Sequence, residues 1–331
     1  MINFQKLSFE ELCNELCVKK STLIIYHVRS DADAVGSAFA LMELLRLLEM
    51  SARCACADEV PDRLRFISDK WQKSVLIDES EIDSYERIIS VDSASPSQLG
   101  VLYNKITKIH LMIDHHAHGN IYATNYVDST SPATAQIVYE IAKALKNRSL
   151  IKEIPLSVCE AIYAGISSDT GGFRFANTTP QTHIVAAELL SAGSDGAMIN
   201  HALYSSKTQG QLKAEGEAAR RMNLYCDGKV AVSLIPNETI CELGLKETDM
   251  ETVIDVPRSL AGVIVAVAIR QPTAENAYRV SMRSVGDVDV AAICAFFGGG
   301  GHMRAAGCTV YADNAETVEK MIVENIKELI K

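Results

Sequence analysis

The chain has 331 residues, of which 48% are hydrophobic, and a formal net charge of −10 at pH 7. This length is sufficient for two domains that each bury a core. The negative charge argues against a long nucleic-acid groove, so an anionic substrate must be short or must meet a local cationic cluster or a metal ion. No apolar stretch approaches the roughly twenty residues of a membrane span, and the first residues lack the layout of a signal peptide. We therefore expect a cytoplasmic protein with no membrane partner.

The nine cysteines are scattered without a CxxC pair and lie mostly in apolar segments. This distribution is typical of reduced thiols that fill a core, rather than of disulfides or zinc ligands. A reducing compartment is the corresponding expectation.

Strand and helix patterns alternate in the first half of the chain. Strands are predicted at 22–26, 87–91 and 108–113, and helices at 34–50, 131–145 and 155–166. Ser131 is the predicted N-cap of the second helix, with Pro132 at its first helical position. Apolar strands separated by helices indicate a parallel sheet that is covered on both faces.

A polar helical pattern over about 195–225 predicts a connection to a second domain. Beyond it, strands are predicted at 229–235, 262–270, 278–284 and 308–312, and helices at 288–297 and 315–330. We therefore predict an α/β protein with a catalytic parallel-sheet domain at 1–193, connector helices at 194–226 and a smaller α/β substrate-binding domain at 227–331. A cleft is expected between the two domains.

Titratable side chains follow each of the early predicted strands. The first strand is followed by His27, Asp31 and Asp33, the second by Asp92, and the third by Asp114, His115 and His116. A single aspartate after a strand is most often a turn residue or a helix cap. The carboxyl ends of parallel strands form one ligand crevice, however, so these groups should converge. Asp169, which follows the predicted helix at 155–166, could reach the same place.

Converging carboxylates would repel one another unless cations lay among them. Carboxylates with a few imidazoles and no thiolate favour manganese or magnesium over zinc. Two ions about 3.5 to 4 Å apart, bridged by a carboxylate and a water, would use all of these ligands. Such a pair would supply a hydroxide nucleophile and a clamp on phosphate.

Five motifs occur in order along the chain: HVRSDADAVGS, SVDSAS, IDHHAHGN, GISSDTGGFRFANTTPQTH and GGGGHMRAAG. With them, the sequence resembles the DHH phosphoesterase superfamily with its DHH-associated C-terminal domain, most closely the nanoRNase/pAp phosphatase (NrnA-like) branch. The resemblance extends over residues 27–310. Ser30 and Ala32 stand where that family usually has proline and often glycine, and neither difference removes a ligand.

The resemblance implies a role for each strand-end residue. One metal ion would be bound by His27, Asp31 and Asp92, and the other by Asp33, Asp92, His115 and Asp169. Asp92 would bridge the two ions. Asp114 would orient the motif, and His116 would face the substrate to stabilise the phosphoryl group or to protonate the leaving oxygen.

A second set of predicted site residues lies in the C-terminal domain. The glycine run follows a predicted helix, so its backbone N–H groups, rather than a helix dipole, would bind phosphate. The predicted substrate-binding residues are Arg283, Ser284, Gly299, Gly300, Gly301, His302 and Arg304. The family places an Arg-Ser pair at 283–284, and guanidinium binds phosphate in a bidentate manner. Arg174 is left open between base stacking and a surface role, and Arg279 is expected on a solvated strand face.

The resemblance implies a metal-dependent phosphoesterase that hydrolyses short RNA oligonucleotides to mononucleotides and 3′-phosphoadenosine 5′-phosphate (pAp) to AMP, and that could form a homodimer. A linear or cyclic dinucleotide phosphodiesterase is one alternative. An inorganic pyrophosphatase or exopolyphosphatase is another, which the glycine run at 298–307 argues against. A metal-loaded nucleotide-binding module without turnover is a third, which the six filled ligand positions argue against.

Overall fold

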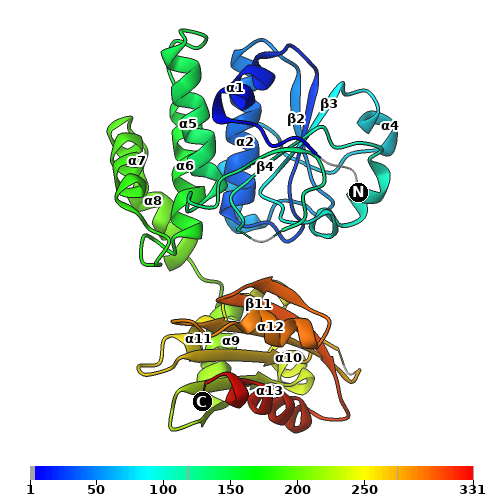
Figure 1. The fold of residues 1–331 in the computed structure, drawn as a ribbon. Helices are drawn as coiled ribbons and strands as arrows, with labels where there is room; N and C mark the ends of the chain where they lie inside the picture. The colour runs from blue at the N-terminus through cyan, green and yellow to red at the C-terminus, as the bar shows by residue number, and fades with distance from the viewer. Residues whose placement is uncertain (1–3, 118, 274, 331) are drawn as a thin grey trace. The chain divides into compact units, whose positions relative to one another are not determined.

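A computed structural model describes residues 4–117, 119–273 and 275–330 of the chain. The chain divides into two units, residues 1–206 and residues 207–331 (Figure 1). Both units combine sheets with helices, which confirms the predicted α/β class with two domains. Among the described residues, no helix has both the length and the apolar character that a membrane span requires.

The first unit is built on a parallel five-stranded sheet in the order β2-β1-β3-β4-β5. Its strands are β1 (Thr22–Ile25), β2 (Ala52–Ala55), β3 (Arg87–Val91), β4 (Leu111–Asp114) and β5 (Thr124–Val127). The apolar runs correctly predicted β1, β3 and β4. The two strands that were missed, β2 and β5, lie at the edges of the sheet, where polar residues weaken the strand pattern.

Successive residues of the central strands point to opposite faces of the sheet, and each face is covered. Ile24 and Ile89 belong to the core with the long helices, whereas Ile25 and Ile88 belong to the core on the other face. The first core receives α1 (Phe9–Cys17), α2 (Ala32–Leu47), α3 (Arg65–Ser68), α5 (Thr134–Asn147), α6 (Leu156–Asp169) and α7 (Pro180–Ser191). The second receives α4 (Glu79–Ile82) and the 3₁₀ segment Pro96–Lys105. This two-sided burial explains the nearly continuous apolar runs.

Helices α2 and α6 approach each other through glycines. A Cβ at Gly36 would lie 2.3 Å from the carbonyl oxygen of Ala161. A Cβ at Gly165 would lie 2.6 Å from the Cβ of Ala135 and 2.8 Å from Oδ1 of Asp33. The close packing therefore holds the start of α2 beside α5 and α6, and no side chain larger than hydrogen fits between them.

Helix α5 begins at Thr134, later than predicted. The prediction of Ser131 as its N-cap is wrong, because Ala133 holds that position without a side-chain cap. The N–H groups of Thr134 and Ala135 donate instead to the carboxylate of Asp33. A carboxylate from a distant segment thus caps this helix, which no local sequence signal could indicate.

The unit boundary falls inside the segment predicted as connector helices, 194–226. Helix α8 (Gly196–Asn200) and a π-helical turn at His201–Ser205 complete the first unit. Helix α9 (Gln209–Arg220) and strand β6 (Met222–Tyr225) begin the second.

The second unit contains a mixed six-stranded sheet in the order β10-β11-β9-β8-β7-β6. The strands after β6 are β7 (Val230–Ile235), β8 (Val265–Arg270), β9 (Ala277–Ser284), β10 (Gly300–His302) and β11 (Ala305–Tyr311). Among the described strands of this sheet, only β7 and β8 pair in parallel. One face carries α12 (Val290–Phe296) and α13 (Ala315–Leu329), and the other carries α9, α10 (Asn237–Leu243), the 3₁₀ turn Glu247–Met250 and α11 (Asp255–Arg258). The strands and helices predicted beyond residue 227 are present, and the missed strands β6 and β10 are again edge strands.

The packing of α2 against α6 predicts the effect of a single methyl group. Gly165→Ala should destabilise the first unit by about 1 to 3 kcal/mol, the usual cost of overpacking, and should displace Asp33. Gly216→Ala on α9 is the matched control, because a Cβ there meets no atom within 4 Å. That substitution should raise stability slightly through the helix propensity of alanine. Thermal unfolding of both variants measures the difference, and equal melting temperatures would contradict the packing argument.

Candidate functional site

The strand-end residues meet at the carboxyl edge of the first sheet. His27 lies just beyond β1, Asp92 directly follows β3, and His115 and His116 directly follow β4. Asp169 is the last residue of α6, which extends beyond the predicted end of that helix. Asp31 is the N-cap of α2, Asp33 lies in its first turn, and Asp114 ends β4. The structure thus brings together all the residues predicted to form the metal site.

Asp92 lies between two imidazoles. Its Oδ2 is 3.6 Å from Nε2 of His27, and its Oδ1 is 3.7 Å from Nε2 of His115. His27 Nε2 is also 3.8 Å from Asp31, and His115 Nε2 is 3.2 Å from Asp169. One carboxylate therefore joins two groups of ligand atoms.

Three groups of side chains have ligand atoms within 4.8 Å of one another. They are His27 with Asp31 and Asp92, Asp33 with His115 and Asp169, and Asp92 with His115 and His116. The first two groups resemble the two predicted ligand sets. The third includes His116, which was predicted to face the substrate, so the role of that histidine stays a prediction.

The orientation of two histidines suits metal binding. Nδ1 of His27 lies 3.0 Å from the carbonyl oxygen of Val28, and Nδ1 of His115 lies 3.3 Å from the carbonyl oxygen of Ser131. A proton on Nδ1 in each contact leaves Nε2 as the nitrogen that faces the carboxylates. Metal-binding histidines are usually held in this way.

The carboxylates of the site repel one another. Burial raises the pKa of Asp33 well above its ordinary value, and the charges of Asp92 and Asp169 raise it further. Burial also raises the pKa of Asp169 to about 6, although its hydrogen bond with His115 opposes the rise. A divalent cation would relieve this repulsion, and the oxygen and nitrogen donors fit such an ion.

The carboxylates of the site also change the pKa values of the neighbouring imidazoles. Burial lowers the pKa of His27, but contacts with Asp92 and Asp31 outweigh burial and raise it to about 10. Burial also lowers the pKa of His115, but contacts with Asp169 and Asp92 outweigh burial and raise this pKa to about 11. A cation that binds among these groups would therefore displace protons from the imidazoles.

The N-terminus of α5 binds two of the acids, a feature that sequence reasoning missed. Thr134 N donates to Asp33 Oδ2 at 2.7 Å, and Ala135 N donates to Asp33 Oδ1 at 2.8 Å. The Thr134 hydroxyl donates to Asp92 Oδ1 at 3.0 Å. Because a helix N-terminus carries partial positive charge, it stabilises both carboxylates in their ionised form.

The backbone of Asp92 is also unusual. Its φ of 51° lies in the left-handed region, which aspartate tolerates better than most residues. Its N–H donates to the carbonyl oxygen of Ile113 in the neighbouring strand at 3.0 Å. The chain therefore turns sharply at the end of β3 while it stays attached to β4, which directs the carboxylate into the site.

Asp114 organises the loop that carries both histidines. Its Oδ1 accepts hydrogen bonds from the backbone N–H groups of His115 and His116 at 2.8 and 3.3 Å. The same oxygen lies 2.6 Å from Nδ1 of His116. Burial lowers the pKa of His116, but the Asp114 contact outweighs burial and raises it. Asp114 therefore holds His116 through Nδ1 and favours its protonated form, and the catalytic role predicted for this aspartate stays a prediction.

The glycine run of the second unit forms one side of a tight hairpin. Gly300 pairs with Gly307, and Gly301 pairs with Ala306, in the β10–β11 ladder. Gly301 has a φ of 144°, and a Cβ there would lie 2.5 Å from the carbonyl oxygen of Ala305. The run is therefore an ordered element and not a loose connector, and Gly299 and Gly301 lie too close to β11 to carry a side chain.

The predicted cationic residues of this unit lie on or beside the same strands. Arg283 on β9 pairs with Ala305 on β11, and its Nη1 donates to the carbonyl oxygen of Met282 at 2.9 Å. Burial lowers its pKa. Arg283 makes no ion pair with any described carboxylate. Arg304 Nε donates to the carbonyl oxygen of Gly286 at 2.9 Å.

Ser284 and His302 are the other two predicted substrate-binding residues with side chains in this unit. The hydroxyl of Ser284 is turned into the unit and donates to the carbonyl oxygen of Val288 at 2.6 Å. The strand alternation predicted this orientation, opposite to Arg283. The side chain of His302 lies outside the described part of the structure.

Arg279 and Arg174 both have defined contacts. Arg279 forms an ion pair with Glu247 at 2.5 Å on the exposed face of β9, as expected for a solvated strand face. Arg174 donates to the carbonyl oxygen of Gly171 at 2.5 Å and lies 5.7 Å from the ring centre of Tyr204. It therefore stacks within the first unit.

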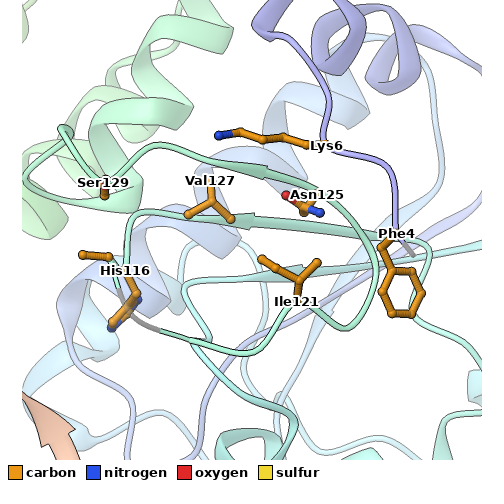
Figure 2. A pocket seen from close by; sticks show the side chains of 8 residues that line it. Phe4, Lys6, His116, Ile121, Asn125, Val127 and Ser129 are labelled. Atoms are coloured by element: carbon orange, nitrogen blue, oxygen red, sulfur yellow. The ribbon is translucent and has the colours of Figure 1, made fainter. Parts of the chain in front are cut away.

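A cavity of about 450 Å³ adjoins His116 (Figure 2). It is lined by Phe4, Lys6, His116, Ala117, Ile121, Asn125, Val127 and Ser129. Sequence reasoning missed this cavity. Residues 4 and 6 precede the first helix, and no motif links them to the loop after β4.

Comparison with known proteins supports the relationship that the motifs indicated. Residues 21–166 match the DHH family, N-terminal domain, and residues 227–330 match the DHHA1 domain. The chain is 29% identical over 306 residues to the bifunctional oligoribonuclease and PAP phosphatase NrnA of Thermus thermophilus, covering 92% of this chain and 89% of that protein. It is 26% identical over 313 residues to the protein of the same name from Bacillus subtilis, covering 93% and 95%.

A solved structure shares the fold. An exopolyphosphatase-related protein from Bacteroides fragilis superposes with a TM-score of 0.88 at 23% sequence identity, covering 98% of each chain. The two domain matches confirm the relationship predicted from the five motifs: the chain belongs to the DHH family and carries its N-terminal domain followed by a DHHA1 domain.

Proposed function

We propose that this protein is a two-metal phosphoesterase that hydrolyses short RNA oligonucleotides to mononucleotides and pAp to AMP. The observation that carries the proposal is the position of Asp92, whose two oxygens face His27 on one side and His115 on the other. The curated relatives that match nearly the whole chain bear the corresponding name.

The donor set supports two divalent cations, with manganese preferred and magnesium as the alternative. One ion would be held by His27, Asp31 and Asp92, and the other by Asp33, Asp92, His115 and Asp169. When bound, such ions lower the pKa of an attacking water and polarise the phosphoryl oxygens. The absence of thiolates from these groups argues against a zinc preference.

The residues of the chain would position and protonate the reacting groups. The α5 N-terminus would hold Asp33 and Asp92 in place and favour their ionised forms. Asp114 occupies Nδ1 of His116, so a proton given to the substrate would come from Nε2. From that position, His116 would stabilise a phosphoryl oxygen or protonate the leaving oxygen.

The second unit would bind the nucleoside and the phosphate beyond the scissile bond. Arg283 and Arg304 provide guanidinium groups, and the backbone of the glycine run allows a phosphate to approach closely. In pAp, this distal phosphate is the 5′-phosphate. A cytoplasmic location is part of the proposal, since all nine cysteines are free thiols. A homodimer stays a prediction.

The proposed bridging role of Asp92 predicts that its substitution impairs both turnover and metal binding. Asp92→Ala should lower turnover about a thousandfold or more and should reduce the bound metal at both sites, because both lose a ligand. Manganese should raise the melting temperature of the wild type and not that of the variant. Asp83→Ala, which changes an exposed acid of the same unit, is the control and should behave as wild type. Near-normal activity of Asp92→Ala with manganese would refute the two-metal assignment.

The orientation of His116 predicts that its substitution lowers turnover without loss of metal. His116→Ala should retain both metal ions and lower kcat about a hundredfold, the range for a lost acid or charge stabiliser. Asp114→Asn should cause a smaller loss, since the amide can still accept from the loop backbone. Metal analysis by mass spectrometry checks the first claim. Loss of one ion from His116→Ala would show that His116 is a ligand, as the third group of ligand atoms permits.

The acidic composition predicts selection for short substrates. Values of kcat/KM should be highest for two to four nucleotides and on the order of a hundredfold lower for a 24-mer, because a longer strand meets no extended cationic track. Arg283→Ala and Arg304→Ala should impair the short substrates most. Arg279→Ala is the matched control, since that guanidinium pairs with Glu247. Equal rates on 24-mers and dinucleotides would overturn this proposal, whereas activity confined to dinucleotides would favour the phosphodiesterase alternative.

A further inference from the structure

The N-terminal segment, residues 4–7, lies along the β5 edge of the first sheet. Leu7 N donates to the carbonyl oxygen of Asn125 at 2.8 Å, and Asn125 N donates to that of Gln5 at 2.9 Å. The Asn125 side chain donates to the same Gln5 oxygen at 3.2 Å. Lys6 and Asn125 form a parallel β-bridge. The segment therefore has a defined register against β5, and the backbone of Lys6 has a fixed position.

The register places Lys6 at the cavity beside His116. Figure 2 shows the Lys6 side chain extending from the N-terminal segment, with His116 on the loop after β4. Asn125 and Val127 of β5 form the wall between these two segments. The cavity is thus built from parts of the chain that are more than a hundred residues apart, and it adjoins a residue of the proposed active site.

The charge of the cavity differs from that of the protein as a whole. None of its eight lining residues is an acid, and Lys6 is the lining residue that carries a permanent positive charge. Within the described part of the chain, Lys6 forms no ion pair. In a protein with a net charge of −10, a cationic cavity without carboxylates suits an anionic ligand.

The remaining lining residues suit the rest of a nucleotide. Phe4, Ile121 and Val127 provide aromatic and aliphatic surface for a base or ribose, and the Ser129 hydroxyl is exposed at the cavity. Base stacking on aromatic side chains tolerates any sequence. The volume of about 450 Å³ lies within the range of small-molecule sites.

We propose that this cavity binds the nucleotide that an oligonucleotide substrate has and pAp lacks. The proposal rests on the proposed function. The scissile phosphate of pAp is bonded to one nucleoside, whereas that of an oligonucleotide is bonded to two. The second unit is proposed to bind the nucleoside that both substrates share. The additional nucleoside occupies the cavity beside His116, and Lys6 pairs with the phosphate that follows it. The N-terminal segment thereby distinguishes the oligoribonuclease reaction from the phosphatase reaction.

Steady-state kinetics with pAp and with a trinucleotide test the proposal. Lys6→Ala should raise KM for the trinucleotide about fivefold to tenfold, the range for one charge-assisted contact at a partly exposed site, and should change KM for pAp by less than twofold. Lys6→Arg should restore the trinucleotide value. Lys152→Ala, which removes an exposed lysine of the same unit away from the cavity, is the matched control. Calorimetry with a phosphorothioate-linked trinucleotide provides a readout without turnover and should show the same loss of affinity.

The outcomes separate the two proposals. If the wild type hydrolyses neither substrate, the proposed function fails. If the wild type hydrolyses both and Lys6→Ala changes neither KM, the cavity is not a nucleotide site. If Lys6→Ala raises both KM values equally, Lys6 acts on the whole active site, and the assignment to the additional nucleotide is wrong.

Discussion

The hydrogen bonds between the start of α5 and two buried carboxylates hold the site together. Asp33 and Asp92 are almost fully removed from water, at 0% and 2% exposure. An ionised carboxylate in such a place is costly unless donors and positive charge surround it. Thr134 and Ala135 supply N–H and hydroxyl donors, and the helix N-terminus supplies partial positive charge. The acids in turn satisfy a helix end that has no cap of its own, so helix and site stabilise each other.

The two adjacent histidines, His115 and His116, are held by different partners. His115 is held through Nδ1 by a backbone carbonyl and directs Nε2 towards Asp92 and Asp169. His116 is held through Nδ1 by Asp114. The first arrangement suits a metal ligand, whereas the second suits a group that carries a proton. The buried side chain of Asp114 thus gives the two neighbouring imidazoles different partners.

An acidic protein that binds anionic substrates must concentrate its positive charge locally. The candidate places are the metal groups, the hairpin region with Arg283 and Arg304, and the cavity with Lys6. Each offers only one or two cations, so each can bind a single phosphate and none can guide a long strand. The proposed preference for short substrates rests on this distribution of charge.

Local patterns in the sequence were enough to predict the α/β class, the central strands and the convergence of acids and imidazoles at one sheet edge. They suffice because a buried parallel strand is a continuous apolar run, and because parallel strands must end on the same side. The edge strands β2, β5, β6 and β10 were missed, since partial exposure removes the apolar signal.

Contacts between distant segments depended on the tertiary structure. Asp33 caps a helix about one hundred residues further along the chain, and Lys6 reaches its cavity through pairing with β5. Neither contact has a periodicity or a spacing that a sequence could display. Packing of one element against another decides both, because hydrogen-bond donors and charges find partners according to distance in space and not along the chain.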